Sequence, residues 1–165
     1  MVTTFVTEQA EAGFADPNAY INESEGTIYV QNNKLDPTPW TNASSNDRLV
    51  AVRNSTQAID RLQYKGAIAD SAQTNQFPRD TDTVVPDAIK SACAELAYCY
   101  LDGVVQEDAF DNLTVTNRKF ASVSITSRDK ANQPHIAAGI PSYEAWVLLL
   151  PFMTDLSGVV VERVN

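Results

Sequence analysis

The residues best suited to proton transfer, nucleophilic attack or metal binding are one histidine, His135, and two cysteines, Cys93 and Cys99. His135 follows Gln-Pro and has no serine or cysteine partner in its sequence context, so we interpret it as a loop residue rather than a general base. A zinc site needs several Cys or His ligands near one another, and the chain does not offer them. There is also no glycine-rich phosphate loop. We therefore expect no enzyme, no metal and no cofactor.

The two cysteines belong to one predicted helix, in which they are six positions apart. Along a helix that spacing is about 9 Å, and the two side chains point to different faces. This is too far for a disulfide between them. We expect both to be reduced, as small apolar residues of the core, in a protein made in a reducing cytoplasm.

Acidic side chains cluster in two predicted loops. Paired carboxylates can serve acid–base chemistry or bind a divalent cation. In a chain with 21 Asp and Glu residues, loop acids are more simply explained as solvated side chains. The residues concerned are Asp80, Asp82, Glu107, Asp108 and Asp111.

The charge balance restricts the class of partner. Lys and Arg number 12 against 21 Asp and Glu, the net charge is −9 and the pI is about 4.4. Tight nucleic-acid binding depends on clustered cations that displace counterions from phosphates. The pair Arg118-Lys119 could contact phosphate, but two charges are too few for a specific claim. An acidic protein can still let DNA pass close by without holding it.

Two long helices are predicted to organise the fold. Apolar residues recur at three- and four-residue steps from Leu49 to Leu62, after a cap at Ser44 or Ser45 and before Lys65-Gly66. The second helix begins at Pro86 and stops at Asp102-Gly103. The fold class we expect is mainly α: a small helical bundle around two long antiparallel helices. A β-strand or hairpin arm, a C-terminal helix and an extension would complete it.

The segments before the first long helix are less regular. We expect a helix over Thr7–Phe14 and a helical turn over Asp16–Ile21. Phe14, Tyr20 and Ile21 would dock this region on the core. Thr27–Val30 is predicted to be a brief strand, followed by a loop up to Trp40 that its two prolines enforce. Trp40 would anchor the start of the first long helix.

The pattern changes after Gly103. We divide the chain into a helical core over residues 1–110 and a second part over 111–165. Strands are expected over Leu113–Val115, Phe120–Thr126 and the tail Gly158–Val164, with a loop over Arg128–Gly139. Between them, Ser142–Leu150 is a short helix that is apolar almost all round. Such a helix is either core or a docking element, and its sequence leaves both possibilities open. It is too short to span a bilayer, and no signal peptide is visible.

The loop between the long helices carries Phe77-Pro78-Arg79. Proline stiffens the loop and phenylalanine can anchor it, which would fix the direction of the guanidinium. Arg79 would then either bind within its own chain, through a salt bridge or carbonyls, or contact another subunit.

Short motifs in this order resemble those of the head–tail connector, adaptor or head-completion proteins of tailed phages, some of which are labelled putative DnaT-like. The resemblance covers roughly residues 3–125. The residues that carry it are Thr4-Phe5-Val6-Thr7, Glu11-Ala12 and Tyr20; Trp40, Ala51, Thr56, Ile59-Asp60, Tyr64 and Gly66; Gln76-Phe77-Pro78-Arg79; Pro86, Ile89-Lys90, Ala92, Glu95-Leu96-Ala97 and Leu101; and Arg118-Lys119-Phe120 to Ile125.

The resemblance implies a structural protein of the virion neck. Such proteins assemble beneath the portal protein as a ring, usually a dodecamer, that continues the DNA channel and offers a platform to tail or nozzle components. Double-stranded DNA would pass through without sequence-specific binding, and no membrane is involved.

The alternative is a single-stranded-DNA-binding replication protein, which would need a basic groove with interleaved aromatic side chains. The aromatic residues are present, but the net charge is of the wrong sign.

Two sets of contact residues follow. By analogy with adaptors whose C-terminal segment reaches the portal, the predicted portal contacts are Tyr143, Trp146, Leu148, Leu149, Leu150 and Phe152. The predicted contacts between subunits are Phe77, Pro78, Arg79, Phe120, Val123 and Ile125.

Overall fold

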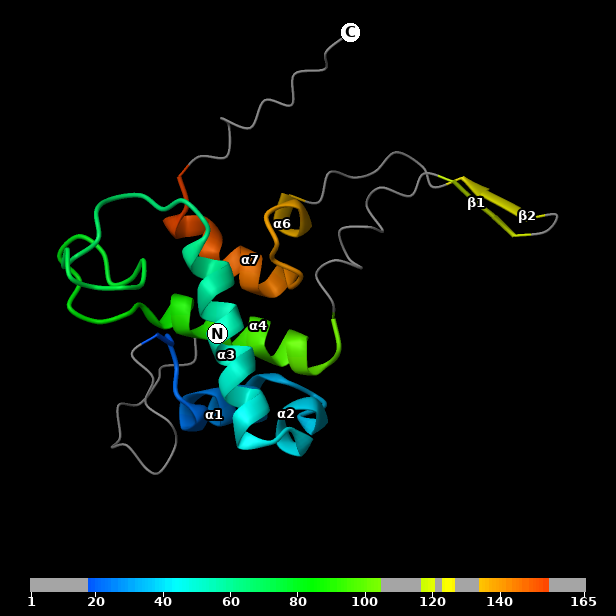
Figure 1. The fold of residues 1–165 in the computed structure, drawn as a ribbon, viewed down its shortest axis with the longest axis horizontal. Coiled ribbons are helices and arrows are strands. Elements are labelled where there is room, and N and C mark those ends of the chain that lie inside the picture. The colour runs from blue at the N-terminus through cyan, green and yellow to red at the C-terminus, as the bar shows by residue number, and fades with distance from the viewer. Residues whose placement is uncertain (1–17, 105–116, 121–122, 127–133, 155–165) are drawn as a thin grey trace, which may run out of the picture.

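The protein is mainly helical in the computed structural model, which describes residues 18–104, 117–120, 123–126 and 134–154 (Figure 1). Of the strands it describes only the backbone. The elements are α1 (Glu23–Asn33), α2 (Thr38–Asn42), α3 (Ser45–Asp60), α4 (Asp87–Leu101), β1 (Asn117–Phe120), β2 (Val123–Thr126), α6 (Pro134–Ala137), α7 (Tyr143–Leu149) and a 3-10 turn, η1 (Leu150–Phe152).

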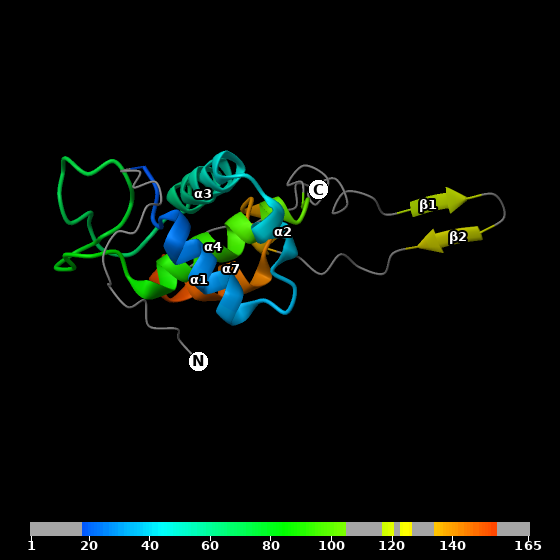
Figure 2. The same ribbon diagram turned by 90° about the horizontal axis from the view of Figure 1, so that it is seen from below.

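The centre of the fold is the contact between α3 and α4, the two long helices predicted from the sequence. Their arrangement differs from the prediction, because α3 lies across α4 rather than antiparallel beside it (Figures 1 and 2). The long connection 61–86 permits this crossing, since it does not impose the reversal that a short turn would. Small side chains, including Ala51, Ser55 and Ala92, are buried at or near this contact and allow the helices to approach closely.

Helix α3 begins as predicted and ends earlier. The Ser44 side chain accepts a hydrogen bond from the Asp47 backbone N–H at 3.1 Å, which satisfies one of the free donors at the helix start. The helix stops at Asp60, not at Lys65-Gly66, because the chain after it bonds to a distant segment. The Lys65 N–H donates to the Phe152 carbonyl at 2.9 Å. Gly66 does adopt a positive φ of 74°, but it lies in the loop.

The predicted strand at Thr27–Val30 is wrong, because these residues belong to α1. A reciprocal capping box starts this helix. The Asn22 side chain accepts from the Glu25 N–H, and the Glu25 carboxylate accepts from the Asn22 N–H, both at 2.9 Å. Tyr29 and Val30 are buried and Ile28 is exposed, whereas a strand would bury alternate residues.

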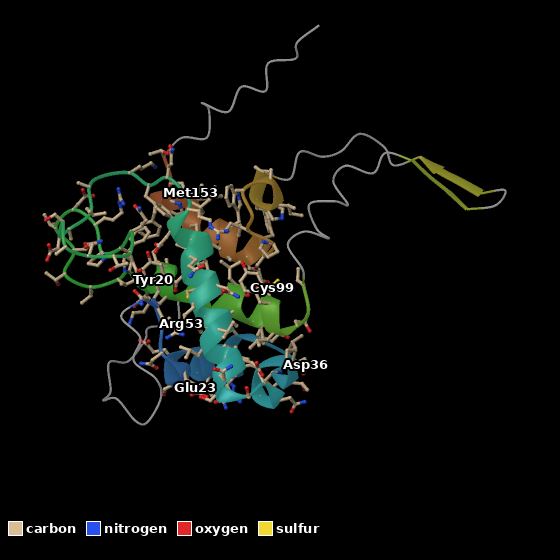
Figure 3. The ribbon with its side chains drawn as sticks, in the orientation of Figure 1. Tyr20, Glu23, Asp36, Arg53, Cys99 and Met153 are labelled. Carbon is tan, nitrogen blue, oxygen red and sulfur yellow. The ribbon has the colours of Figure 1, made fainter. Side chains whose placement is uncertain are left out.

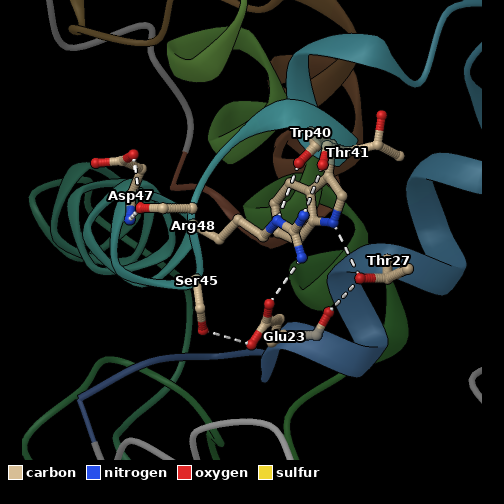
Figure 4. Close-up of polar contacts among 8 residues, drawn as sticks. Glu23, Thr27, Trp40, Thr41, Ser45, Asp47 and Arg48 are labelled. Atoms are coloured by element: carbon tan, nitrogen blue, oxygen red, sulfur yellow. Dashed lines mark hydrogen bonds and ion pairs between the residues drawn. The ribbon is translucent and has the colours of Figure 1, made fainter.

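Trp40 anchors the first three helices to one another. It lies in α2, where the sequence predicted a loop, and it is fully buried. Its indole N–H donates to the Thr27 hydroxyl at 3.0 Å. The Arg48 guanidinium donates to the Trp40 carbonyl at 2.9 Å and pairs with Glu23 at 2.7 Å (Figure 4). This polar cluster holds α1, α2 and α3 together at the side of the core.

Helix α4 confirms its prediction, from Pro86 at the N-cap to Asp102 at the C-cap and Gly103 with a positive φ of 86°. One side of α4 is covered by α3, and α1 and α7 also pack on it. The buried apolar core is formed by Tyr20, Ile21, Tyr29, Val30, Trp40, Ala51, Val52, Ala58, Ile59, Tyr64, Phe77, Ile89, Ala92, Cys93, Ala94, Leu96, Ala97, Ile140, Ala145, Trp146, Leu149 and Met153.

The part after Gly103 differs from its prediction in two places. The single strand expected over Phe120–Thr126 is instead interrupted, because Phe120 ends β1 and is the antiparallel partner of Val123 at the start of β2. The loop expected over Arg128–Gly139 contains α6, which ends before Gly139 at a positive φ of 79°. That β1 and β2 serve as an arm stays a prediction, as does the division at residue 110.

Several predictions lie outside the described residues. They are the helix over Thr7–Phe14, the docking of Phe14, the strand at Leu113–Val115 and the tail strand at Gly158–Val164. Within the described part, Tyr20 and Ile21 dock on the core as predicted, although they lie in a bend and not in the helical turn that was expected. None of the helices described is long and apolar enough to cross a membrane.

Candidate interaction surface

The two faces of α7 have different roles. Ser142 caps the helix by accepting a hydrogen bond from the Ala145 N–H at 3.2 Å. Ala145, Trp146 and Leu149 are buried against α4. The solvent-exposed side carries Glu144 and an apolar strip, in which 66% of Tyr143, 45% of Val147 and 41% of Leu150 is exposed. These three, at positions i, i+4 and i+7, form a stripe along one side of the helix, which we call the outer stripe of α7.

The outer stripe includes part of the predicted portal contact. Tyr143 and Leu150 are available at the surface, and Leu148 and Phe152 are half-buried. Trp146 and Leu149 are buried in the core of the protein itself. Sequence reasoning missed Val147, although its helical spacing from Tyr143 was a usable signal. Of the two possibilities left open for this helix, the core role holds for one face, and docking through the other face stays a prediction.

A buried ionic cluster lies beneath one edge of α7. The Glu95 carboxylate, from α4, is only 4% exposed. It accepts a hydrogen bond from the Tyr29 hydroxyl at 2.6 Å and pairs with the Lys34 ammonium at 2.5 Å. Lys34 also reaches Glu144 of α7 at 2.9 Å. The cluster thus connects α1, α4 and α7 through one cation and two carboxylates.

Burial and pairing shift the pKa values in this cluster. Burial raises the pKa of Glu95, although Lys34 and Tyr29 counteract part of the effect. Burial works against the charge on Lys34, but hydrogen bonds to Glu95 and Glu144 raise its pKa on balance. The Lys34 ammonium lowers the pKa of Glu144. Lys34 is therefore held charged at neutral pH.

A surface pocket opens between α1 and α7 over this cluster. Tyr29 and Asn33 contribute from α1, Glu95 from α4, and Tyr143, Glu144, Val147 and Leu148 from α7. The pocket lining therefore combines two carboxylates, one buried and one exposed, with aromatic and aliphatic side chains.

The Phe77-Pro78-Arg79 loop is fixed to the protein's own core. The Phe77 ring is buried and makes edge-to-face contacts with Tyr20, Tyr64 and Phe152, the closest being with Tyr64 at 4.7 Å between centroids. Its backbone N–H donates to the Tyr20 hydroxyl at 3.2 Å. The ring that was predicted at a subunit contact therefore lies inside one protomer, because it closes the core at this end.

Arg79 binds carbonyls of its own chain. Its guanidinium donates to the Lys65 carbonyl at 2.8 Å and to the Gly66 carbonyl at 2.6 Å. It also donates to the Gln76 side chain at 2.8 Å. Of the two roles considered for Arg79, this is the intrachain one. A further contact of this loop with another subunit stays a prediction, as do subunit contacts at Phe120, Val123 and Ile125.

Tyr20 and Asp60 attach the same loop to α3. The Tyr20 hydroxyl donates to the Asp60 carboxylate, which also accepts from the Gln76 N–H at 3.1 Å. Burial raises the pKa of Asp60, and it raises the pKa of Tyr20 as well. Figure 3 shows Tyr20 where the loop meets the helices, and Met153, which forms an isolated bridge with Tyr64, at the same side of the molecule. This network holds the loop against α3.

The other chemically reactive residues take structural positions. Cys93 is fully buried beside Thr56, and burial raises the pKa of its thiol to about 12. Cys99 is half-buried with a thiol pKa raised to about 11. Both are free thiols, as predicted. His135 lies against the rings of Tyr143 and Trp146, and burial lowers its pKa. Over the ranges described, no group of His, Cys, Asp or Glu is placed to hold a metal ion.

Several basic side chains of the described helices have partners within the chain. Lys90 pairs with Glu25 at 2.6 Å, in addition to the pairs of Lys34 and Arg48 given above. Arg53 and Arg61 lie along one side of α3 and its C-cap. They line a polar pocket together with Asn18, Thr56, Gln57, Asp60, Thr74 and Asn75. Two guanidinium groups therefore line one common pocket.

Comparison with known proteins gives one match. A family model whose description reads "Putative DnaT-like ssDNA binding protein" matches residues 3–163, almost the whole chain. No curated protein and no solved structure matches.

Proposed function

The chain belongs to this DnaT-like family, and on that premise we propose that it is a structural, non-enzymatic adaptor of the neck of a tailed phage. It would assemble as a ring beneath the portal protein, extend the DNA channel and present a platform to tail or nozzle components. It would be made in the host cytoplasm and end in the virion. The phage role itself rests on the motif resemblance over residues 3–125.

The observation that carries the proposal is the outer stripe of α7. Tyr143, Val147 and Leu150 expose a continuous apolar strip on a helix whose other face is anchored in the core. Burying about three such side chains stabilises a complex by several kcal/mol before the costs of association. A rigid helix that presents apolar side chains is suited to binding a protein partner.

The charge pattern fits a channel wall better than a DNA-binding surface. The chain carries a net charge of −9. Lys34, Arg48 and Lys90 are neutralised by carboxylates of the same chain. Fewer cations are then available to displace counterions from phosphates. DNA could move past such a surface without being retained.

The β1–β2 hairpin supplies a second element of the proposal. A two-stranded sheet is marginally stable in water unless its apolar face is covered. Phe120, Val123 and Ile125 would be covered by an adjacent subunit in the ring, with the Phe77-Pro78-Arg79 loop close to the same interface.

The proposal is tested by light scattering after size exclusion, with and without purified portal protein. We expect the wild-type chain to co-elute with the portal and the Val147→Asp variant to lose that association. Val50→Asp is the matched control, because Val50 of α3 is equally exposed, at 44%, on another helix. Equal portal binding by wild type and Val147→Asp would exclude the outer stripe as the docking site, and no portal association at all would reject the adaptor.

A second candidate is binding of single-stranded DNA, which the family description names. The pocket with Arg53 and Arg61 favours it, since two guanidinium groups and several side-chain amides could contact phosphate and base edges. A fluorescently labelled oligo-dT titrated at low salt distinguishes the two functions. Tight binding that Arg61→Ala weakens and salt abolishes, together with no portal association, would establish this function and reject the adaptor.

A further inference from the structure

The pocket between α1 and α7 is formed by the way these two helices pack on α4. Both helices pack on α4, and Glu95 of α4 forms the bottom of the gap between them. Tyr29 stands on the α1 side, and Tyr143 and Val147 stand on the α7 side. The pocket is continuous with the outer stripe, because Tyr143 and Val147 belong to both.

The charges in this pocket do not balance. Glu95 and Glu144 converge on Lys34, at 2.5 Å and 2.9 Å from its ammonium nitrogen. Two carboxylates against one ammonium leave one surplus negative charge. The Glu95 carboxylate is largely satisfied by Lys34 and Tyr29, so the surplus resides mainly on Glu144, whose side chain is 69% exposed. A cation brought by a partner would find an accessible carboxylate here.

The rim suits an arginine more than a lysine. A guanidinium can pair with the Glu144 carboxylate through two parallel hydrogen bonds. It can also stack on an aromatic ring such as that of Tyr143, while its aliphatic stem lies against Val147. A lysine ammonium is more strongly hydrated and makes neither the bidentate contact nor the stacking contact.

We propose that the pocket receives an arginine side chain from a partner segment whose flanking apolar residues cover the outer stripe of α7. This inference rests on the proposed function, in which that stripe docks a protein partner, and it adds the chemistry by which the partner is recognised. A nucleic-acid phosphate would be repelled by the surplus negative charge. A second copy of this chain is disfavoured by its own net charge of −9.

The test uses the full chain labelled with ¹⁵N and two peptides that differ at one residue. One is acetyl-Ala-Leu-Arg-Leu-Ala-amide, and the other has glutamate in place of arginine. We expect the arginine peptide to shift the backbone amide signals of Tyr29, Asn33 and the segment 143–148, and the glutamate peptide to leave them in place. Raising the salt concentration from 50 to 500 mM should weaken binding of the arginine peptide, because the ion pair between its arginine and Glu144 would be partly exposed.

Matched variants assign the contact to one carboxylate. Glu144→Gln should lower the affinity for the arginine peptide about two- to fivefold, the range expected for a partly exposed charge pair. Asp82→Asn removes the same charge from an exposed loop position away from the pocket, and should leave binding unchanged. Unchanged HSQC signals away from the substituted residue would show that each variant remains folded.

Three results would overturn the inference. The first is equal binding of the two peptides, or binding that Glu144→Gln does not change. The second is stronger displacement of the same signals by a peptide of residues 155–165, which would make the chain's own C-terminal segment the occupant. The third is a dimer that Val147→Asp dissociates, which would make it a second copy. Binding to the portal protein is measured in a separate experiment. If portal binding depends on Val147 but the arginine and glutamate peptides bind equally, the adaptor proposal stands and the pocket inference fails.

Discussion

The Gly26→Ala substitution in α1 should change the stability of the protein through two opposing effects, a gain in helix propensity and a loss in core packing. In an isolated helix, alanine is more favourable than glycine by about 1 kcal/mol. In the folded protein, a Cβ at this position would lie 2.5 Å from Trp40 Cη2 and 2.6 Å from Trp40 Cζ2. Carbon atoms in contact are normally about 3.5–4.0 Å apart. The indole ring would therefore have to move by about 1 Å.

Trp40 has little freedom to make that movement. It is fully buried, and its N–H is bonded to the Thr27 hydroxyl at 3.0 Å. Overpacking a core typically costs about 1–3 kcal/mol, and weakening the indole hydrogen bond adds about 1 kcal/mol. Subtracting the gain in helix propensity leaves a net destabilisation of about 1–3 kcal/mol. Packing should therefore outweigh propensity.

Urea denaturation followed by tryptophan fluorescence measures the effect. We expect Gly26→Ala to unfold at a lower urea concentration than wild type with an unchanged m-value. Asn32→Ala is the control, because Asn32 is exposed on the same helix and should be neutral or stabilising by about 0.5 kcal/mol. A Gly26→Ala protein that is more stable than wild type would refute the argument from Trp40.

Three further predictions follow from local contacts. Ser44→Ala removes the α3 cap and should lower the free energy of unfolding by about 1 kcal/mol, measured by urea titration. Lys34→Met leaves the buried Glu95 carboxylate without its cation, so its folded-state pKa should rise further above the unfolded value. Stability should then decrease as pH rises from 5 to 8, more steeply than in wild type, because the folded state binds the extra proton. In the native protein at pH 8, Cys93 should not react with the thiol reagent DTNB, and Cys99 should react slowly; both should react at once in urea.

Each of these has a result that contradicts it. Equal unfolding midpoints for Ser44→Ala and wild type would mean that the cap contributes nothing. A Lys34→Met protein whose stability increases with pH would show that Glu95 is not held in a low-dielectric site. Fast labelling of Cys93 under native conditions would mean that the α3–α4 contact opens readily.

Helix signals in the sequence were reliable where they were local. The Ser44 cap, the Pro86 start and the Gly103 stop all predicted real boundaries, because each acts on the few backbone groups next to it. The α1 error had a local cause as well. The Asn22…Glu25 capping box signals a helix start in the sequence, whereas the β-branched and aromatic residues at Thr27–Val30 by themselves favour a strand.

The candidate surface was only partly predictable. The apolar character of Ser142–Leu150 indicated an element buried on more than one side, and the structure divides it into a core face and an outer stripe. Which residues belong to each face depends on how α7 lies on α4. The cluster of Lys34, Glu95 and Glu144 could not be found from the sequence, since its members are up to 110 residues apart and belong to three separate segments.

The sequence by itself determined that the protein is acidic and mainly helical, and where α3, α4 and α7 begin. These properties depend on composition and on interactions between residues within a turn or two of one another. Only the tertiary structure decided that α3 crosses α4, that Phe77 closes the core and that Tyr143 and Val147 remain at the surface. Those outcomes depend on which side chains compete for the same buried volume, and that competition takes place between residues far apart in the chain.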